Sequence, residues 1–209
     1  MDNKHKIILA SKSPRRAEIL RMIGLDFKVV PSKIKEKINP NIEQNEIAIA
    51  ISKAKAEKIS CKYPTDIIIG ADTIVVLNGK IFGKPKDSHE SKKMLKALSD
   101  NTHKVITGVT IVNESMGFLK TFSEVTEVLV RKIPTKKIEY YITNFNTLDK
   151  AGSYGIQEWF SVWIEKINGC YYNVMGLPVS KLYRYLAEFE KIMKWWSFNN
   201  LVSFLSYKK

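Results

Sequence analysis

The sequence has little of the residue types that build metal centres and disulfide frameworks. Among 209 residues there are two cysteines, Cys61 and Cys170, and three histidines. The cysteines form no CxxC pair, and no histidine stands at metal-ligand spacing from either of them. We therefore expect reduced structural thiols rather than a zinc site or a disulfide scaffold.

Long hydrophobic runs are also missing. The longest apolar stretches are as long as a strand, and no basic segment followed by an apolar one stands near the N-terminus. The sequence therefore predicts no membrane span, and we expect a cytoplasmic protein. With 44% hydrophobic residues, the chain is nevertheless long enough to bury a sizeable core.

Acidic residues are scarce relative to basic ones. Against 34 lysines and arginines stand 21 aspartates and glutamates, which gives a formal net charge of +13. Such an excess is typical of proteins that bind nucleic acid, an anionic surface or polyanionic small molecules. The lysines are scattered through every segment, with no basic stripe between aromatic residues. This distribution favours solvated lysines and argues against a stable nucleic-acid complex.

The hydrophobic pattern predicts helices and strands in mixed order. Strands are expected over residues 7–10, 27–30, 67–69, 74–77, 103–112, 118–130, 162–167 and 171–174, and helices over 14–23, 46–60, 87–98, 134–142 and 182–193. The Asn-Gly pairs at 78–79 and 168–169 indicate hairpin turns. The order of elements favours a mixed α/β fold with hairpins over a strict βαβ alternation.

A Ser-Lys-Ser-Pro-Arg-Arg segment near the N-terminus points to an anion. Ser13 is a favoured N-cap and Pro14 suits the first helical position, so a helix begins here. Arg15 and Arg16 then lie at the positive end of the helix dipole, where a cation is disfavoured by roughly 0.3–1 kcal/mol. With the hydroxyl groups of Ser11 and Ser13 and free backbone N–H groups, they suit a phosphate. Alternatively, both arginines are solvated or pair with nearby acids.

Five further polar residues could take part in chemistry. Asp72 is surrounded in the sequence by apolar, strand-forming residues. It could be a metal ligand, a general base, or an aspartate in a strand-end turn that bonds to the backbone. Lys84, just past the first hairpin, returns toward Asp72 and could supply a cation, whereas Lys53 and Glu36 could equally be solvated. Gln157 follows a Gly-Ser-Tyr-Gly stretch that either lets the backbone approach a ligand or only turns the chain.

Six short motifs follow one another along the chain: SKSPRR (11–16), GADT (70–73), GKP (83–85), TGV (107–109), DKAGSYGIQ (149–157) and GLP (176–178). Together they resemble the Maf family of nucleotide pyrophosphatases, and SxSPRR with KAGxYGIQ are the most specific. The resemblance implies an α/β fold like that of inosine triphosphate pyrophosphatases, with a mixed, strongly bent sheet, flanking helices and a central cleft between two lobes. It assigns residues 1–187 to this domain and leaves 188–209 as an aromatic-rich, helical C-terminal extension.

The resemblance also implies an activity and a set of site residues. Family members typically form homodimers and cleave nucleoside triphosphates to a monophosphate and pyrophosphate with a divalent cation, here Mg2+ or Mn2+. Asp72 matches the proton acceptor of the family and, with Glu36, is a candidate metal ligand. The implied catalytic residues are Asp72, Lys84, Glu36 and Lys53, and the implied substrate-binding residues are Ser11, Ser13, Arg15, Arg16, Thr73 and Gln157.

Three of these residues, Arg15, Thr73 and Gln157, are similar to those of the family branch that acts on dTTP and UTP. One departure is that the family usually has Glu-Pro where this chain has Asn146 and Thr147. Two other functions are weighed against the enzyme: a non-catalytic nucleotide-binding regulator of cell division, and a nucleic-acid-binding protein. A pure binding protein has no need to keep Asp72, Lys84 and Glu36 together in the family context, which favours catalysis.

Overall fold

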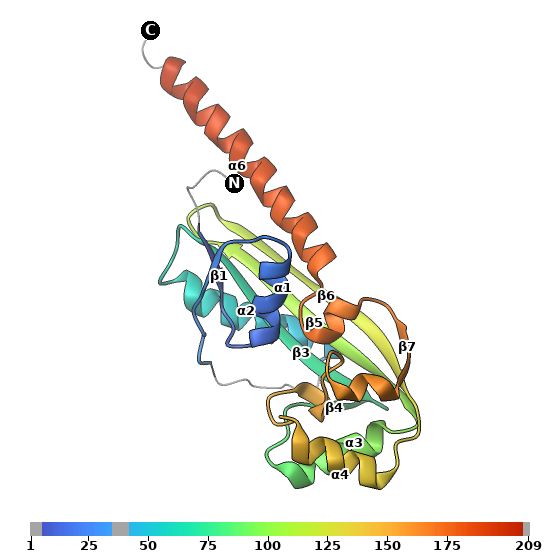
Figure 1. Ribbon diagram of the computed structural model, residues 1–209. Coiled ribbons are helices and arrows are strands. Elements are labelled where there is room, and N and C mark those ends of the chain that lie inside the picture. Colours follow the sequence, from blue (N-terminus) through green and yellow to red (C-terminus); the bar gives the residue numbers. More distant parts are fainter. Residues whose placement is uncertain (1–5, 35–41, 207–209) are drawn as a thin grey trace.

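A seven-stranded mixed sheet forms the centre of the molecule (Figure 1). The computed structural model describes residues 6–34 and 42–192, together with the helical backbone of 193–206. The strands are β1 (Ile7–Leu9), β2 (Phe27–Val29), β3 (Ile67–Leu77), β4 (Lys80–Phe82), β5 (Asn101–Asn113), β6 (Phe118–Val130) and β7 (Ile164–Asn168). Their order is β2-β1-β3-β5-β6-β7, and β4 pairs with β3. β1 pairs in parallel with β2 and β3 and all other pairs are antiparallel, which confirms the expected mixed α/β class.

Helices cover both faces of this sheet. They are α1 (Pro14–Met22), α2 (Gln44–Ser60), α3 (Ser88–Leu98), α4 (Thr135–Asn144), α5 (Tyr171–Met175) and α6 (Val179–Ser206), with 3-10 turns η1 (Ala151–Ser153) and η2 (Trp159–Trp163). Ile7 and Leu9 pack with α1 and α6 on one face, whereas Ile8 packs with α2 on the other. This division follows from the period of two in a strand, because neighbouring residues point to opposite faces. Figure 1 shows α6 continuing well beyond the body.

Two hydrophobic cores lie along one face of the long strands. Ala71 of β3 and Val109 of β5 belong to the core under α1 and α6, and Val75 and Val105 belong to the core under α3 and α4. The residue midway between them on the same face is polar in both strands: Thr73 in β3, directly opposite Thr107 in β5. The alternation of apolar residues is therefore interrupted once in each strand, and this point separates two lobes.

Two parts of the chain differ from the expectation. Residues 67–77 form one continuous strand, without the expected interruption at residues 70–73. Gly70 lies inside this strand, and a Cβ there would lie 2.3 Å from the backbone oxygen of Ser52 in α2. The glycine thus allows close packing of a helix on the strand. Residues 171–175 form a short helix and not a strand, so the expected hairpin over Asn168 and Gly169 is wrong: β7 pairs with β6 and is followed by α5. The side chain of Asn173 in this helix is buried and donates hydrogen bonds to Val105 O and Thr126 Oγ1.

Within the described residues, no helix combines the length and the apolarity that a bilayer crossing requires.

Candidate active site

A cavity of about 450 Å3 opens between the two lobes. Its walls come from segments far apart in the chain: residues 10–16, 31–34, 72–73, 149–151 and 154–157, with Lys55, Val75, Lys84, Val105 and 174–176. This size is in the range of small-molecule sites in proteins. The cavity lies over the polar break at Thr73, so the interruption of the two cores marks the position of the site.

The start of α1 forms one wall of the cavity. Ser13 is the N-cap residue and Pro14 the first residue of the helix, as expected, but the side chain of Ser13 makes no capping hydrogen bond within the described residues. The hydroxyl of Ser11 instead accepts a hydrogen bond from the backbone N–H of Ser13 at 3.2 Å. Backbone N–H groups at such a helix start suit an anion.

The two arginines of this turn have different partners. Arg16 is buried and donates to Gly176 O, Ser11 Oγ and Thr73 Oγ1 at 2.8, 3.0 and 2.9 Å, so it ties α1 to β3 and to the end of α5. Arg15 lies at 2.9 Å from Asp149 Oδ2 and also donates to the backbone oxygen of Asp149. For Arg15, the alternative of pairing with an acid is therefore the one observed.

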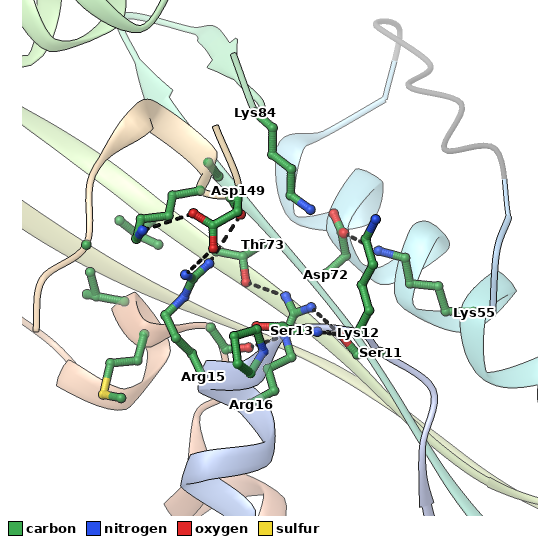
Figure 2. Close-up of a pocket in the computed structure, with 18 of the residues that line it drawn as sticks. Ser11, Lys12, Ser13, Arg15, Arg16, Lys55, Asp72, Thr73, Lys84 and Asp149 are labelled. Carbon is green, nitrogen blue, oxygen red and sulfur yellow. Dashed lines mark hydrogen bonds and ion pairs between the residues drawn. The ribbon is translucent and has the colours of Figure 1, made fainter. Parts of the chain in front are cut away.

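Asp72 forms an ion pair with a lysine that the sequence analysis did not single out. Its carboxylate lies at 2.6 Å from Lys55 Nζ, and the Asp72 residue is 7% exposed (Figure 2). Asp72 stands inside β3, opposite Gly108 of β5, and not in a strand-end turn. The buried carboxylate is thus compensated by a cation from α2, as its burial requires.

Lys53, expected among the catalytic residues, does not reach this cavity. Its side chain is 44% exposed and lies at 3.7 Å from Glu57 on the outer side of α2. Residues 53 and 55 are separated by about 200° around a helix, so only one of them can face the sheet. Lys55 lies on the buried stripe of α2 with Ile51, Ser52, Ala56 and Ile59, and this stripe is the signal that could have identified it.

The structure brings most of the other expected residues together. Figure 2 shows Lys84 extending from the segment after β4 toward Asp72. Gln157 lines the same cavity near its edge, where its amide donates to Glu18 at 3.3 Å. The expected residues that line the cavity are Ser11, Ser13, Arg15, Arg16, Asp72, Thr73, Lys84 and Gln157. Glu36 lies outside the described residues.

The cavity carries a large excess of positive charge. Its described lining has seven cationic residues, Lys12, Arg15, Arg16, Lys33, Lys55, Lys84 and Lys150, and two carboxylates, Asp72 and Asp149. Burial acts to raise the pKa of Asp149, but hydrogen bonds from Lys150 and Arg15 hold it below its usual value. Both charges and hydrogen-bond donors therefore favour a ligand with several negative charges, such as a polyphosphate.

Comparison with known proteins agrees with this geometry. The family model described as "Maf-like protein" matches residues 6–189. A dTTP/UTP pyrophosphatase of Carboxydothermus hydrogenoformans is 44% identical over 88% of this chain and 98% of its own length. One of Pyrococcus furiosus is 50% identical over 83% of this chain and 90% of its own.

A solved HAM1 protein from Coxiella burnetii superposes with a TM-score of 0.42 at 18% identity, covering 62% of this chain and 75% of that one. The family match spans most of the chain and includes both walls of the cavity. The chain belongs to the Maf family.

Proposed function

We propose that the chain is a nucleoside triphosphate pyrophosphatase that hydrolyses dTTP and UTP, and modified pyrimidine nucleotides, and so removes them from the nucleotide pool. The observation that carries this proposal is the ion pair of Asp72 and Lys55 in a cavity whose other wall is the phosphate-binding turn of α1. The names of the relatives in Carboxydothermus hydrogenoformans and Pyrococcus furiosus support the substrate class.

In the proposed reaction, water attacks the α-phosphorus of the nucleotide. A P–O bond forms to the water oxygen, the bond between the α-phosphorus and the bridging oxygen breaks, and pyrophosphate leaves. The carboxylate of Asp72 lies at 2.6 Å from the ammonium group of Lys55 and would accept the proton of the attacking water. Arg15, Arg16 and Lys84 bind the phosphates and offset the charge that develops on the leaving group.

A divalent cation, Mg2+ or Mn2+, fits this site. Mg2+ is commonly held by one or two protein carboxylates together with substrate phosphates, and Asp72 presents such a carboxylate in the cavity. Among the described residues, no three histidines, cysteines or carboxylates lie close enough together to hold a metal ion. The substrate phosphates would therefore complete the coordination of the cation. When bound, the cation would neutralise phosphate charge. We include Glu36 as a second ligand on the family resemblance alone.

The proposal extends to the nucleobase. The oxygen of the Gln157 amide can accept from N3–H of uracil or thymine while its NH2 group donates to O4, whereas cytosine presents the opposite polarity at both positions. The contact with Glu18 involves the amide nitrogen and so favours one orientation of the amide. On the resemblance alone we also propose a homodimer that acts in the cytoplasm.

The experiment is a turnover screen with dTTP, UTP, CTP and purine nucleoside triphosphates, with Mg2+ or Mn2+ and with a chelator. We expect dTTP and UTP to yield the monophosphate and pyrophosphate. Release of single phosphate would refute attack at the α-phosphorus. Binding to duplex DNA with a steep salt dependence and no turnover of any nucleotide would favour the nucleic-acid-binding alternative.

The same screen with Gln157→Ala tests the role of that residue. We expect kcat/KM to fall more for dTTP and UTP than for CTP. An equal fall for all three nucleotides would show that Gln157 positions the nucleotide without selecting the base.

A further inference from the structure

A cluster of three buried or half-buried polar side chains lies behind the loop that carries Gln157. Lys150 Nζ lies at 2.8 Å from Glu158 Oε1, and the Lys150 side chain is 5% exposed. The hydroxyl of Tyr141, from α4, donates to Glu158 Oε2 at 2.9 Å. Each oxygen of the Glu158 carboxylate therefore has its own partner, which fixes the orientation of the carboxylate.

Tyr141 is also bonded to the backbone of the loop. Its hydroxyl accepts a hydrogen bond from the N–H of Gly155 at 3.0 Å. The Tyr141 side chain is 1% exposed, and burial raises its pKa well above the usual value, so the hydroxyl keeps its proton. Tyr141 can then donate to Glu158 and accept from Gly155 at the same time.

The loop backbone packs directly on this cluster. A Cβ at Gly155 would lie 2.9 Å from Glu158 Cδ and 3.0 Å from Lys150 Cε, so a side chain there would displace Glu158 or Lys150. The same lysine continues the connection to the phosphate-binding wall, because it lies at 2.9 Å from Asp149, which in turn holds Arg15. The family usually has a glutamate at the position of Asn146. Here Asn146 has no carboxylate, and its backbone carbonyl accepts a hydrogen bond from Lys150. The carboxylates that pair with the Lys150 ammonium group are those of Asp149 and Glu158.

We propose that Tyr141, Lys150 and Glu158 form a clamp that positions Gln157 for nucleobase recognition. The clamp fixes the chain two residues before Gln157, at Gly155, and one residue after it, at Glu158. Gln157 itself is exposed and donates to Glu18 at 3.3 Å, so the backbone on either side sets where its side chain begins and Glu18 orients its amide. The inference rests on the proposed function, since it gives Gln157 a nucleobase to recognise.

The test compares Tyr141→Phe with Tyr140→Phe. Both remove one hydroxyl from neighbouring residues of α4, but Tyr140 is exposed and its hydroxyl bonds to none of the described residues. In Tyr141→Phe we expect the ratio of kcat/KM for dTTP over dCTP to fall about fivefold, the scale of one hydrogen bond, through a higher KM for dTTP. The Tyr140→Phe variant should keep the ratio of the wild type.

Glu158→Gln provides a second variant that keeps a partner for Tyr141 but removes the carboxylate from Lys150. It should lower the same ratio. An unchanged ratio in Tyr141→Phe and Glu158→Gln overturns the proposal. An equal loss for dTTP and dCTP together with a lower melting temperature also overturns it, because the cluster would then only stabilise the fold.

Equilibrium binding separates this inference from the proposed function. In the Asp72→Asn background, which should consume nucleotide at least about 100-fold more slowly, calorimetry with dTTP and dCTP measures the ratio of the two binding affinities with little turnover. We expect Tyr141→Phe to reduce it about fivefold there too. If the wild-type chain releases no pyrophosphate, the proposed function fails while the binding ratio still decides the role of the clamp. Failure of both nucleotides to bind to the wild-type chain overturns both.

Discussion

At the scale of single residues, the ion pair between Asp72 and Lys55 combines two requirements. A carboxylate in the middle of a buried strand needs a cation for stability, and a general base needs to be ionised. The ammonium group of Lys55, at 2.6 Å, compensates the carboxylate of Asp72, which is the base of the proposed reaction. The same pair therefore gives one variant that separates chemistry from folding and another that affects both.

Asp72→Asn separates chemistry from folding. The amide keeps the size of the side chain and can accept a hydrogen bond from Lys55, but it cannot accept a proton from water. We expect turnover of dTTP to fall by at least about 100-fold, the scale of a lost general base. Steady-state rates and thermal unfolding of the same preparation check this. A variant with a near-normal rate would reduce Asp72 to a structural role.

Lys55→Met and Lys53→Met form a matched pair on one helix. Lys55→Met removes the cation from a buried carboxylate and should lower the free energy of unfolding by about 1.5–3 kcal/mol, together with turnover. Lys53→Met changes an exposed lysine outside the cavity and should stay within about 0.5 kcal/mol of the wild type. Urea unfolding and turnover measure both effects. Loss of activity in Lys53→Met alone would restore the role that the family resemblance assigned to it.

The sequence allowed most of the cavity lining to be predicted, because the phosphate-binding turn and the Gly-Ser-Tyr-Gly loop are each contiguous. Lys55 could not be found in that way. Two lysines two residues apart in a helix occupy different faces, and the stripe of Ile51, Ala56 and Ile59 is the sequence signal for the face on which Lys55 lies. Asp149 as the partner of Arg15 was missed for a similar reason, since the two residues are 134 positions apart and meet only in the folded chain.

At the scale of elements, local propensity failed where tertiary contacts decide. The aromatic residues at 171–172 favour a strand, yet residues 171–175 form α5, because Asn173 has its hydrogen-bond partners in β5 and β6. The hairpin over Asn78 and Gly79 was correct, since both residues adopt positive φ, at 49° and 77°. A two-residue turn depends on its own residues, whereas a five-residue helix depends on its neighbours.

β5 carries a buried histidine that should make stability depend on pH. His103 is 1% exposed, and its Nε2 lies at 2.7 Å from the hydroxyl of Tyr154. Burial lowers the pKa of His103 from 6.5 to about 4. Between these values the unfolded chain binds a proton that the folded chain does not, so the free energy of unfolding falls as the pH decreases from 6.5 to about 4, by roughly 3 kcal/mol.

His103→Gln tests this dependence, because glutamine can still bond to Tyr154 but does not titrate. Urea unfolding of the wild type at pH 7 and pH 5 should show a lower midpoint at pH 5, and the variant should show a smaller difference. The exposed His89→Gln in α3 is the matched control and should keep the wild-type difference. Equal pH dependence in His103→Gln and in the wild type would contradict the assignment.

At the scale of the whole molecule, the cleft arises from how two cores share three long strands. Val75 and Ala71 stand two positions to either side of Thr73, each in a different core, and β5 repeats this arrangement around Thr107. The hydroxyls of Thr73 and Thr107 lie 2.9 Å apart, and Thr73 accepts from Arg16. Thr73, one of the two polar residues that divide the cores, thus also holds Arg16 in the wall of the cavity.

The excess positive charge of the molecule should speed the arrival of substrate. The formal net charge is +13, and seven cationic residues against two carboxylates line the cavity between the lobes. A cleft lined by one sign of charge raises association rates of oppositely charged ligands by about 10- to 1,000-fold at low ionic strength.

Between about 0.01 M and 1 M salt the Debye length falls from about 30 Å to about 3 Å, so kcat/KM for dTTP should fall at least about tenfold. Because a bound nucleotide no longer has to diffuse, kcat should change little, and a neutral osmolyte at matched osmolarity should leave both parameters near their low-salt values. Steady-state kinetics across this range make the measurement. A parallel fall of kcat and kcat/KM would show that salt acts on the site and not on association, and an unchanged kcat/KM would show that the charge does not steer the substrate.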